Sequence, residues 1–225
     1  MITIRGLRKS YFGNEVLKGV DLTLSPGHVY GIMGHNGAGK TTLFNCIAGI
    51  EPYEGRIESP FSLLKNHLGY LMTDLYFFPM MTGREYLILC CAARGRSGID
   101  FDARNIFHLP LDQYARTYST GMKKKLALLA ILLQDNDVFI LDEAFNGLDL
   151  QSTLIVTEIV LELKRLKKTV LLSSHIFSTL QETCDLLYIL EDGRCQRSYN
   201  KDAFSDLDRQ LRVFGNEGIG MLGLK

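Results

Sequence analysis

The segment from Gly34 to Thr41 has the residue types and the spacing of a phosphate-binding loop. It reads GHNGAGKT and matches the pattern G-x-x-x-x-G-K-[ST]. Its glycines let the backbone curl until successive N–H groups point at phosphate oxygens, and a helix expected from about Lys40 adds its positive N-terminal end. Lys40 would reach the β- and γ-phosphates, and the Thr41 hydroxyl would bind Mg²⁺, which prefers oxygen ligands. The residues predicted to hold a nucleotide in this loop are Gly34, His35, Asn36, Gly37, Ala38, Gly39, Lys40, Thr41 and Thr42.

Two acidic residues, Asp142 and Glu143, follow the apolar run VFIL at 138–141. A carboxylate at the carboxyl end of a buried strand is the expected Mg²⁺ partner of a phosphate loop, which assigns that role to Asp142. Glu143, one residue further out, is placed to polarise the attacking water as a general base. His175 follows the strand-like run at 169–174 and is expected at the same sheet edge, although a histidine in such a place is more often structural than catalytic. Together the loop and the acids indicate a Mg²⁺-dependent nucleoside triphosphatase.

The elements that must position these residues follow from the hydrophobic pattern. Short apolar runs alternate with longer stretches of helical period, which predicts an α/β domain with a largely parallel central sheet. Two segments that alternate apolar with polar residues predict half-buried antiparallel strands near the N-terminus. The helix after the loop is expected to end at Gly49, in a left-handed conformation. The strands are predicted over 2–7, 20–24, 29–33, 68–71, 138–141, 169–172 and 186–190.

A helical insert is predicted between two of these strands. Thr82 and Glu85 have the spacing of a capping box, so a helix is expected to start there and to run through Ala93. The glycines at 94–99 break this pattern. We expect an insert from Thr82 to about Ser119, which with the start of the next helix makes a helical subdomain of about 82–130. The main domain is predicted over 1–205, with a loosely attached tail over 206–225.

The composition limits the kinds of partner and compartment. The 225 residues contain 25 Lys and Arg and 25 Asp and Glu, a balance that gives no sign of a nucleic-acid footprint. The five cysteines are an odd number and include the adjacent Cys90 and Cys91, which fits a reducing cytosol better than a secreted disulfide framework. No run approaches the ~18 apolar residues that a membrane span needs. We therefore expect any membrane spans to come from another chain.

The order of features from Tyr11 to His175 resembles the nucleotide-binding subunit of ABC transporters. The segment YSTGM at 118–122 is similar to the family signature, commonly LSGGQ, and a basic run at 123–125 follows it. The Walker B run VFILDE at 138–143, a D-loop at 146–149 and the switch histidine follow in the family's order. The resemblance covers nearly the whole chain except the tail. It implies a P-loop NTPase core with an N-terminal antiparallel β subdomain and a small helical insert.

The resemblance also implies a dimer that binds ATP between its two chains. Ser119 and Gly121 open a predicted helix, so a hydroxyl, backbone N–H groups and the helix dipole form a second anion site. In the family this site binds the γ-phosphate held by the opposite subunit of a homodimer or heterodimer, and Glu143, His175 and Lys40 are the catalytic residues. Tyr11 matches the aromatic residue that stacks on adenine, although a core role for Tyr11 or the adjacent Phe12 is equally open.

A membrane partner is the second implication. The segment Leu75–Met81 matches the region that receives the coupling helix of a membrane-spanning subunit, and its apolar side chains could equally fill the join between the helical insert and the sheet. The chain would then lie in the cytoplasm, peripheral on the inner face of the plasma membrane. The short insert, the TGREYL stretch at 82–87 and YSTGM are most similar to exporters of the ABC-2 type. Motifs do not specify the cargo.

Two positions depart from the family pattern. Thr73 aligns with the glutamine that usually contacts the metal and its water; Thr73 or Asp74 takes over that contact, or the contact is absent. Ala144 replaces the proline after the catalytic glutamate and leaves Asp142 and Glu143 intact. Two alternatives to a transporter subunit are a soluble ABC-type ATPase not coupled to transport and a regulatory module that only binds ATP. No basic arm or duplicated domain favours the first, and Glu143 and His175 argue against the second.

Overall fold

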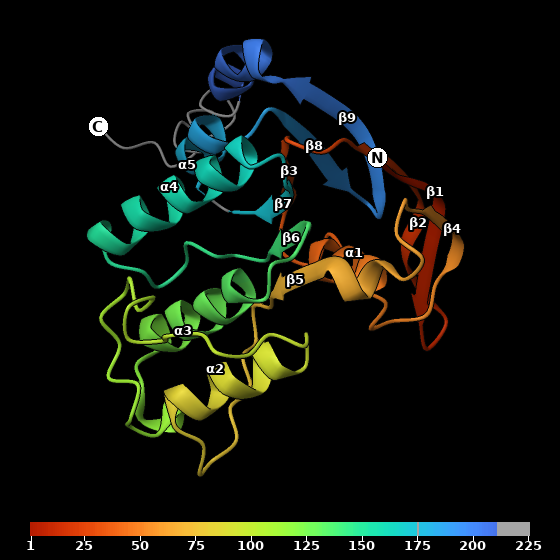
Figure 1. The fold of residues 1–225 in the computed structure, drawn as a ribbon. Helices are drawn as coiled ribbons and strands as arrows, with labels where there is room; N and C mark the ends of the chain where they lie inside the picture. Colours follow the sequence, from red (N-terminus) through yellow and green to blue (C-terminus); the bar gives the residue numbers. More distant parts are fainter. Residues whose placement is uncertain (175, 211–225) are drawn as a thin grey trace.

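The computed structural model describes residues 1–174 and 176–210, which form two β-sheets and the helices that pack on them (Figure 1). His175 and residues 211–225 lie outside the described residues, so the role predicted for His175 stays a prediction. The α/β class, the parallel-dominated sheet and the antiparallel N-terminal sheet are confirmed. Among the described residues, no helix combines the length and the apolar character required to cross a bilayer.

The larger sheet has six strands in the order β5-β6-β7-β3-β8-β9. The first five strands in that order are parallel and β9 pairs antiparallel at the edge. The bounds are β3 (Val29–Met33), β5 (Leu68–Leu71), β6 (Val138–Leu141), β7 (Thr169–Ser173), β8 (Leu186–Glu191) and β9 (Arg194–Asn200). The apolar runs predicted the five parallel strands almost to the residue, because a parallel strand buried on both faces is apolar throughout.

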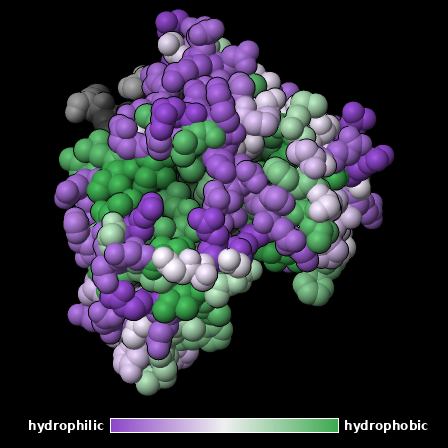
Figure 2. Space-filling model, in the orientation of Figure 1, coloured by the Kyte–Doolittle hydropathy of each residue, from purple (hydrophilic) through white to green (hydrophobic). Residues whose placement is uncertain are grey.

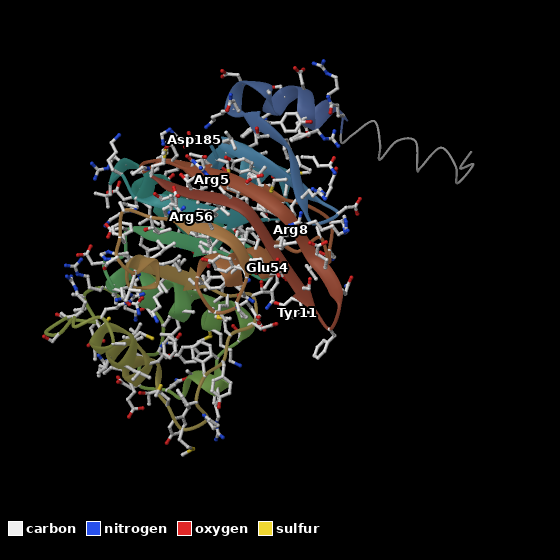
Figure 3. All side chains as sticks on the ribbon, turned by 90° about the vertical axis from the view of Figure 1, so that its right-hand side faces the viewer. Arg5, Arg8, Tyr11, Glu54, Arg56 and Asp185 are labelled. Atoms are coloured by element: carbon white, nitrogen blue, oxygen red, sulfur yellow. The ribbon has the colours of Figure 1, made fainter. Side chains whose placement is uncertain are left out.

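The smaller sheet is antiparallel, in the order β2-β1-β4. It comprises β1 (Ile2–Tyr11), β2 (Asn14–Leu24) and β4 (Glu54–Glu58). The first two strands are longer than predicted and meet in a tight hairpin, whose Phe12 and Gly13 both have positive φ. Its outward face carries the labelled Arg5, Arg8 and Arg56 (Figure 3).

Helix α1 (Lys40–Ile47) lies between the two sheets (Figure 1). Its Leu43 and Phe44 are buried in a cluster that also takes the inward side chains of β1 and β2 and alternate residues of the large sheet. Gly49 follows the helix with φ +72°, the left-handed conformation predicted for it. Helix α1 therefore packs against a sheet on each side, and this packing fixes the phosphate loop from which it begins.

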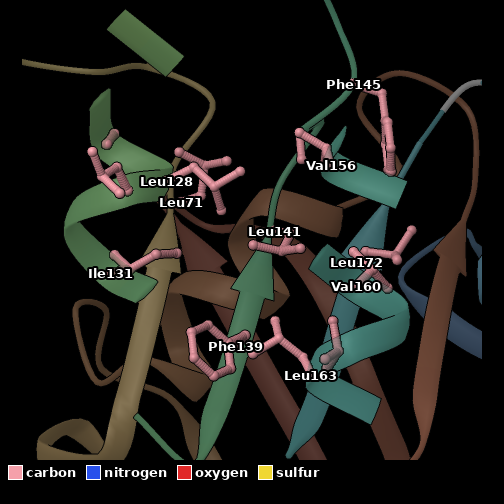
Figure 4. Close-up of a cluster of buried hydrophobic side chains, with 14 of the residues drawn as sticks. Leu71, Leu128, Ile131, Phe139, Leu141, Phe145, Val156, Val160, Leu163 and Leu172 are labelled. Atoms are coloured by element: carbon pink, nitrogen blue, oxygen red, sulfur yellow. The ribbon is translucent and has the colours of Figure 1, made fainter. Parts of the chain in front are cut away.

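The opposite face of the large sheet is covered by α3 (Thr120–Leu133), α4 (Leu150–Arg165) and α5 (Phe177–Thr183). Figure 4 shows part of this core, to which Phe139 and Leu141 of β6, Leu128 of α3 and Val160 of α4 all belong. The residues of each central strand thus alternate between two apolar clusters. This two-sided burial holds the carboxyl ends of β3, β6 and β7 in one row.

The helical insert contains α2 (Gly83–Ala92), which packs on α3, and the short turn η2 (Ala115–Thr117). The predicted capping box is present: the Thr82 side chain accepts from Glu85 N, and the Glu85 carboxylate accepts from Thr82 N at 2.8 Å. The remainder of the insert is irregular and is tied by Arg84, which pairs with Asp102 at 2.9 Å and with Asp112 at 2.7 Å.

The tail predicted over 206–225 begins within a helix, and its residues 211–225 lie outside the described residues. After η3 (Lys201–Ala203), residues 204–210 are helical, and Phe204 and Leu207 are buried in the large core.

The short η1 (Leu64–His67) precedes β5. Elsewhere the outward face of α4 leaves apolar side chains exposed, visible as the green area over that helix in Figure 2, with Leu154 and Leu166 among them.

Candidate functional site

The phosphate loop joins β3 to α1 and depends on its glycines. A Cβ on Gly34 would lie 2.3 Å from the Leu190 carbonyl oxygen, a contact that real side chains do not make. Gly39 caps α1 with φ +104°, a conformation that favours glycine. The loop therefore runs close to β8 and turns sharply into the helix, which leaves the first N–H groups of α1 at its rim.

Lys40 folds into this loop. Its Nζ donates to the backbone oxygens of Gly34 at 2.7 Å and His35 at 3.2 Å, and the side chain is almost completely buried. Two carbonyl oxygens of the loop thus hold the ammonium within it. A phosphate anion bound in the loop would find a positive charge already in position.

The Asp142 carboxylate accepts hydrogen bonds from two hydroxyl groups, one on α1 and one on β7. Thr41 Oγ1 donates to Asp142 Oδ2 at 2.6 Å, and Ser173 Oγ donates to Asp142 Oδ1, also at 2.6 Å. The sequence interpretation missed Ser173. It ends β7, which pairs with β6 in parallel, and a hydroxyl residue at that strand end was the signal that could have revealed it.

Glu143 has a left-handed backbone, with φ +53°, unusual for a residue with a side chain. Its N–H donates to Ser173 Oγ at 2.9 Å, and its Oε2 accepts from Asn146 Nδ2 at 3.0 Å. Asn146 was recognised only as part of the D-loop. The first contact holds the backbone and the second the carboxylate of Glu143, which lines the same cavity as Asp142 and the phosphate loop.

Lys40, Thr41, Asp142 and Glu143 line one cavity of about 480 Å³. It brings together most of the predicted nucleotide and metal residues, and Thr73, but not Asp74, is among its lining residues. The predicted residues that line it are Tyr11, Asn36, Gly37, Gly39, Lys40, Thr41, Thr42, Thr73, Asp142 and Glu143. Of the described residues, Val16 and Asn146 also line the cavity without having been predicted as site residues.

Tyr11 ends β1 near the hairpin (Figure 3) and lines this cavity. The Lys9 ammonium lies 4.6 Å from the centre of its ring, a cation–π contact that holds the ring. Phe12 is fully exposed at the tip of the hairpin. The alternative that either ring belongs to the core is therefore wrong, since Tyr11 faces the cavity and Phe12 faces solvent.

Ser119 and Gly121 start α3 outside this cavity. Ser119 is the N-cap, and its Oγ accepts from Met122 N at 3.2 Å, as predicted for a helix start. A Cβ on Gly121 would lie 3.0 Å from the Gly147 carbonyl oxygen, so this position packs closely on the D-loop. Neither residue is among those that line the cavity of the same chain.

The segment Leu75–Met81 is buried in part and exposed in part. Phe77 is 8% exposed and belongs to the large core, against which Leu75 also packs. Tyr76, Phe78 and Met80 are 72%, 51% and 66% exposed, and the first two rings contact each other edge to face. The segment is thus anchored by two side chains and presents three apolar ones to the outside.

The cysteines contribute no nucleophile to the site. None of the five, all within the described residues, forms a disulfide. Burial raises the pKa of Cys46 to about 11 and that of Cys184 and Cys195 to about 12, so these side chains stay as unreactive thiols.

Comparison with known proteins decides the family. A family model described as ABC transporter matches residues 17–146, which is more than half of the chain. The chain belongs to this family. An uncharacterised ABC transporter ATP-binding protein of Nostoc sp. is 32% identical over 90% of this chain, which spans only 65% of that relative's length. The ABC transporter ATP-binding protein NatA of Bacillus subtilis is 33% identical, over 80% of this chain and 79% of its own.

The fold agrees with this assignment. The solved structure of an ATP-binding subunit of an ABC transporter superposes with a TM-score of 0.83 and 27% identity, covering 95% of this chain and 94% of its own. The phosphate loop is thus the Walker A motif of an ABC-type ATPase domain, and 138–143 is its Walker B motif. Residues 118–122, which resemble the ABC signature, include the N-cap and the first residues of α3.

Proposed function

We propose that this chain is the ATP-binding subunit of an ABC exporter and that it hydrolyses MgATP to drive an unidentified substrate through a separate membrane-spanning subunit. The observation that carries the proposal is the meeting of Lys40, Thr41, Asp142 and Glu143 in one cavity next to an aromatic ring. Each has the chemistry that a triphosphate, its metal or its attacking water requires.

The nucleotide would lie along the cavity from Tyr11 to the start of α1. The Tyr11 ring offers a flat surface for adenine, and the loop N–H groups and Lys40 take the phosphates. The Lys40 ammonium would exchange its hydrogen bonds to the Gly34 and His35 carbonyl oxygens for hydrogen bonds to phosphate oxygens. The new bonds are stronger because both partners are charged. Binding therefore exchanges internal hydrogen bonds for contacts with the ligand.

The residues present fit Mg²⁺. Thr41 and Asp142 supply a hydroxyl and a carboxylate that already meet at 2.6 Å, and the Thr73 hydroxyl lines the same cavity. No group of three or more His, Cys, Asp or Glu side chains that could hold a metal occurs in the described part of the chain. A set of few protein oxygens suits Mg²⁺, which keeps waters and takes substrate phosphates as ligands. When bound, Mg²⁺ would neutralise charge on the phosphate oxygens.

Glu143 would accept a proton from the water that attacks the γ-phosphate. Its N–H contact with Ser173 and its side-chain contact with Asn146 keep the carboxylate oriented before the substrate arrives. His175 is proposed as the switch residue next to the γ-phosphate. In this scheme the chain contributes the Glu143 carboxylate and the charge of Lys40 to hydrolysis.

A second nucleotide-binding chain would complete the site. Ser119 and Gly121 open α3, whose N-terminal dipole and N–H groups suit an anion, and both lie apart from the cavity of their own chain. We propose that they bind the γ-phosphate of ATP held by the partner in a head-to-tail dimer. ATP then links two chains, and its hydrolysis removes the contacts that keep them closed.

The membrane-spanning partner would dock on Tyr76, Phe78 and Met80. An exposed apolar group of this kind is typical of an interaction site. In this proposal the chain is a peripheral subunit on the cytoplasmic face of the plasma membrane. Export is the direction that the short insert and the YSTGM signature favour by their similarity to ABC-2 exporters.

The direct test is ATP hydrolysis by the purified chain, compared with Lys40→Ala. We expect phosphate release that requires Mg²⁺ and is lost on chelation, and a large loss of MgATP affinity in the variant, because a charge leaves the phosphate loop. Replacement of the half-exposed Lys123 by Ala is the control for the loss of one positive charge. Unchanged affinity of Lys40→Ala for MgATP would contradict the assignment of the loop.

A further inference from the structure

Lys124 is a buried lysine next to the Walker B turn. The sequence gives no reason to separate it from Lys123 and Lys125, since all three follow the signature on α3. In the structure Lys124 is 5% exposed, whereas both neighbours are half-buried. A lysine removed from water to this extent needs polar partners to offset its lost hydration.

The partners are two carbonyl oxygens of the turn that follows β6. Lys124 Nζ donates to Glu143 O at 2.7 Å and to Asn146 O at 2.8 Å. Within the turn, Asn146 N donates to Glu143 O at 3.1 Å, and Asn146 Nδ2 donates to Glu143 Oε2 at 3.0 Å. Lys124 therefore donates hydrogen bonds to both ends of the turn at 143–146, in which the Asn146 side chain holds the Glu143 carboxylate.

The turn has a conformation that needs such support. Glu143 has φ +53°, which is unfavourable for a residue with a Cβ and persists only where the surroundings enforce it. The backbone conformation of Glu143 sets the direction of its Cα–Cβ bond. Whatever holds the carbonyl of Glu143 therefore also helps to aim its carboxylate into the cavity.

Helix α3 is attached to the D-loop at two further points. Lys125 Nζ lies 3.2 Å from Asp149 Oδ2, and Gly121 packs against the Gly147 carbonyl. Burial lowers the pKa of Lys124, while the carboxylates of Glu143 and Asp142 oppose that shift. The turn that carries Glu143 is thus fixed to the helix whose first residues carry the signature.

We propose that Lys124 is a positioning residue for hydrolysis. Lys124 links the turn at 143–146 to α3, so that the Glu143 carboxylate is aimed at the attacking water only while α3 is packed against this turn. This inference rests on the proposed ATP hydrolysis. Lys124 touches neither nucleotide nor water in this scheme and acts through the backbone of residues 143–146.

The test is the steady-state kinetics of Lys124→Met in the full chain. Methionine keeps a long side chain and removes the ammonium, so we expect kcat to fall about 10- to 100-fold, as for a catalytic group displaced by about an ångström. The KM for MgATP should stay within about twofold, because the phosphate loop is untouched. Lys124→Arg, which keeps the charge and N–H donors, should restore part of kcat, and Lys123→Met should keep the wild-type value.

A second measurement separates positioning from general damage. In a Glu143→Gln background the carboxylate is already gone, so Lys124→Met should reduce the residual rate by less than about threefold. An unchanged kcat in Lys124→Met, or the same fold-loss in both backgrounds, overturns the role of Lys124. If Lys124→Met does not fold, Lys124→Gln replaces it with the same expectations. Wild-type protein without ATPase activity would instead refute the proposed function itself, together with this role.

Discussion

The carboxylate of Glu143 allows the most direct test at the scale of single residues. Replacing it by Gln keeps an oxygen that can accept from Asn146, so the local geometry should persist while proton acceptance is lost. We expect MgATP binding to remain and hydrolysis to slow about 10²- to 10⁴-fold, the usual range for removal of a general base. An ATP-bound dimer should then accumulate and elute earlier on size exclusion than the nucleotide-free chain.

The matched control is Glu158→Gln, an exposed carboxylate on α4. It should hydrolyse ATP like the wild type and show no trapped dimer. If Glu143→Gln stays monomeric with MgATP while the wild type hydrolyses normally, the dimer model fails. If the variant hydrolyses at the wild-type rate, Glu143 is not the base.

The residues that the sequence did not predict act through tertiary contacts. Lys40, Asp142 and Glu143 belong to local motifs, so their types and spacing were enough to identify them. Ser173 and Lys124 come from other segments and acquire their contacts with Asp142 and Glu143 only when β7 and α3 pack next to β6. No spacing in the chain encodes which of three consecutive lysines faces inward.

The start of α2 provides a prediction at the scale of one element. Thr82→Ala removes the side-chain oxygen that accepts from Glu85 N, and with it half of the capping box. The expected loss is about 1 kcal/mol in the free energy of unfolding, the usual cost of an N-cap deletion. Chemical denaturation monitored by circular dichroism measures it. Thr82→Ser keeps the oxygen and should lose little; equal losses in both variants would assign the effect to the missing methyl group instead.

The strands differ in how far their sequence could predict them. β6 and β7 are apolar throughout and were found with nearly correct ends, because both of their faces are buried. β4 (EGRIE) and β9 (RCQRSYN) lie at sheet edges, are largely exposed and carry no alternating apolar pattern, so neither was predicted. They form because the neighbouring strand offers backbone partners. That information belongs to the packed sheet and not to the local sequence.

At the scale of the whole molecule, the nucleotide cavity and the exposed side chains of Tyr76, Phe78 and Met80 belong to different parts of the chain. The cavity is built by β1, the Walker A loop and the Walker B turn, whereas Tyr76, Phe78 and Met80 follow β5 and precede α2. Thr73 lines the cavity and lies two residues from Leu75, which packs on the large core. The short link from Thr73 to Phe78 therefore offers a direct path by which a change at the nucleotide could reach a docked partner.

Phe78 tests whether this surface is the docking site. Phe78→Lys places a charge at a position that is 51% exposed and outside the core, so the stability and ATPase activity of the isolated chain should match the wild type. The membrane-spanning partner should no longer co-purify with this variant from mild detergent. Leu166→Lys at the C-cap of α4, 52% exposed, is the matched control and should keep the partner. Co-purification of the partner with both variants would rule out Phe78 as a docking residue, and its loss with both would indicate a general effect of surface charge.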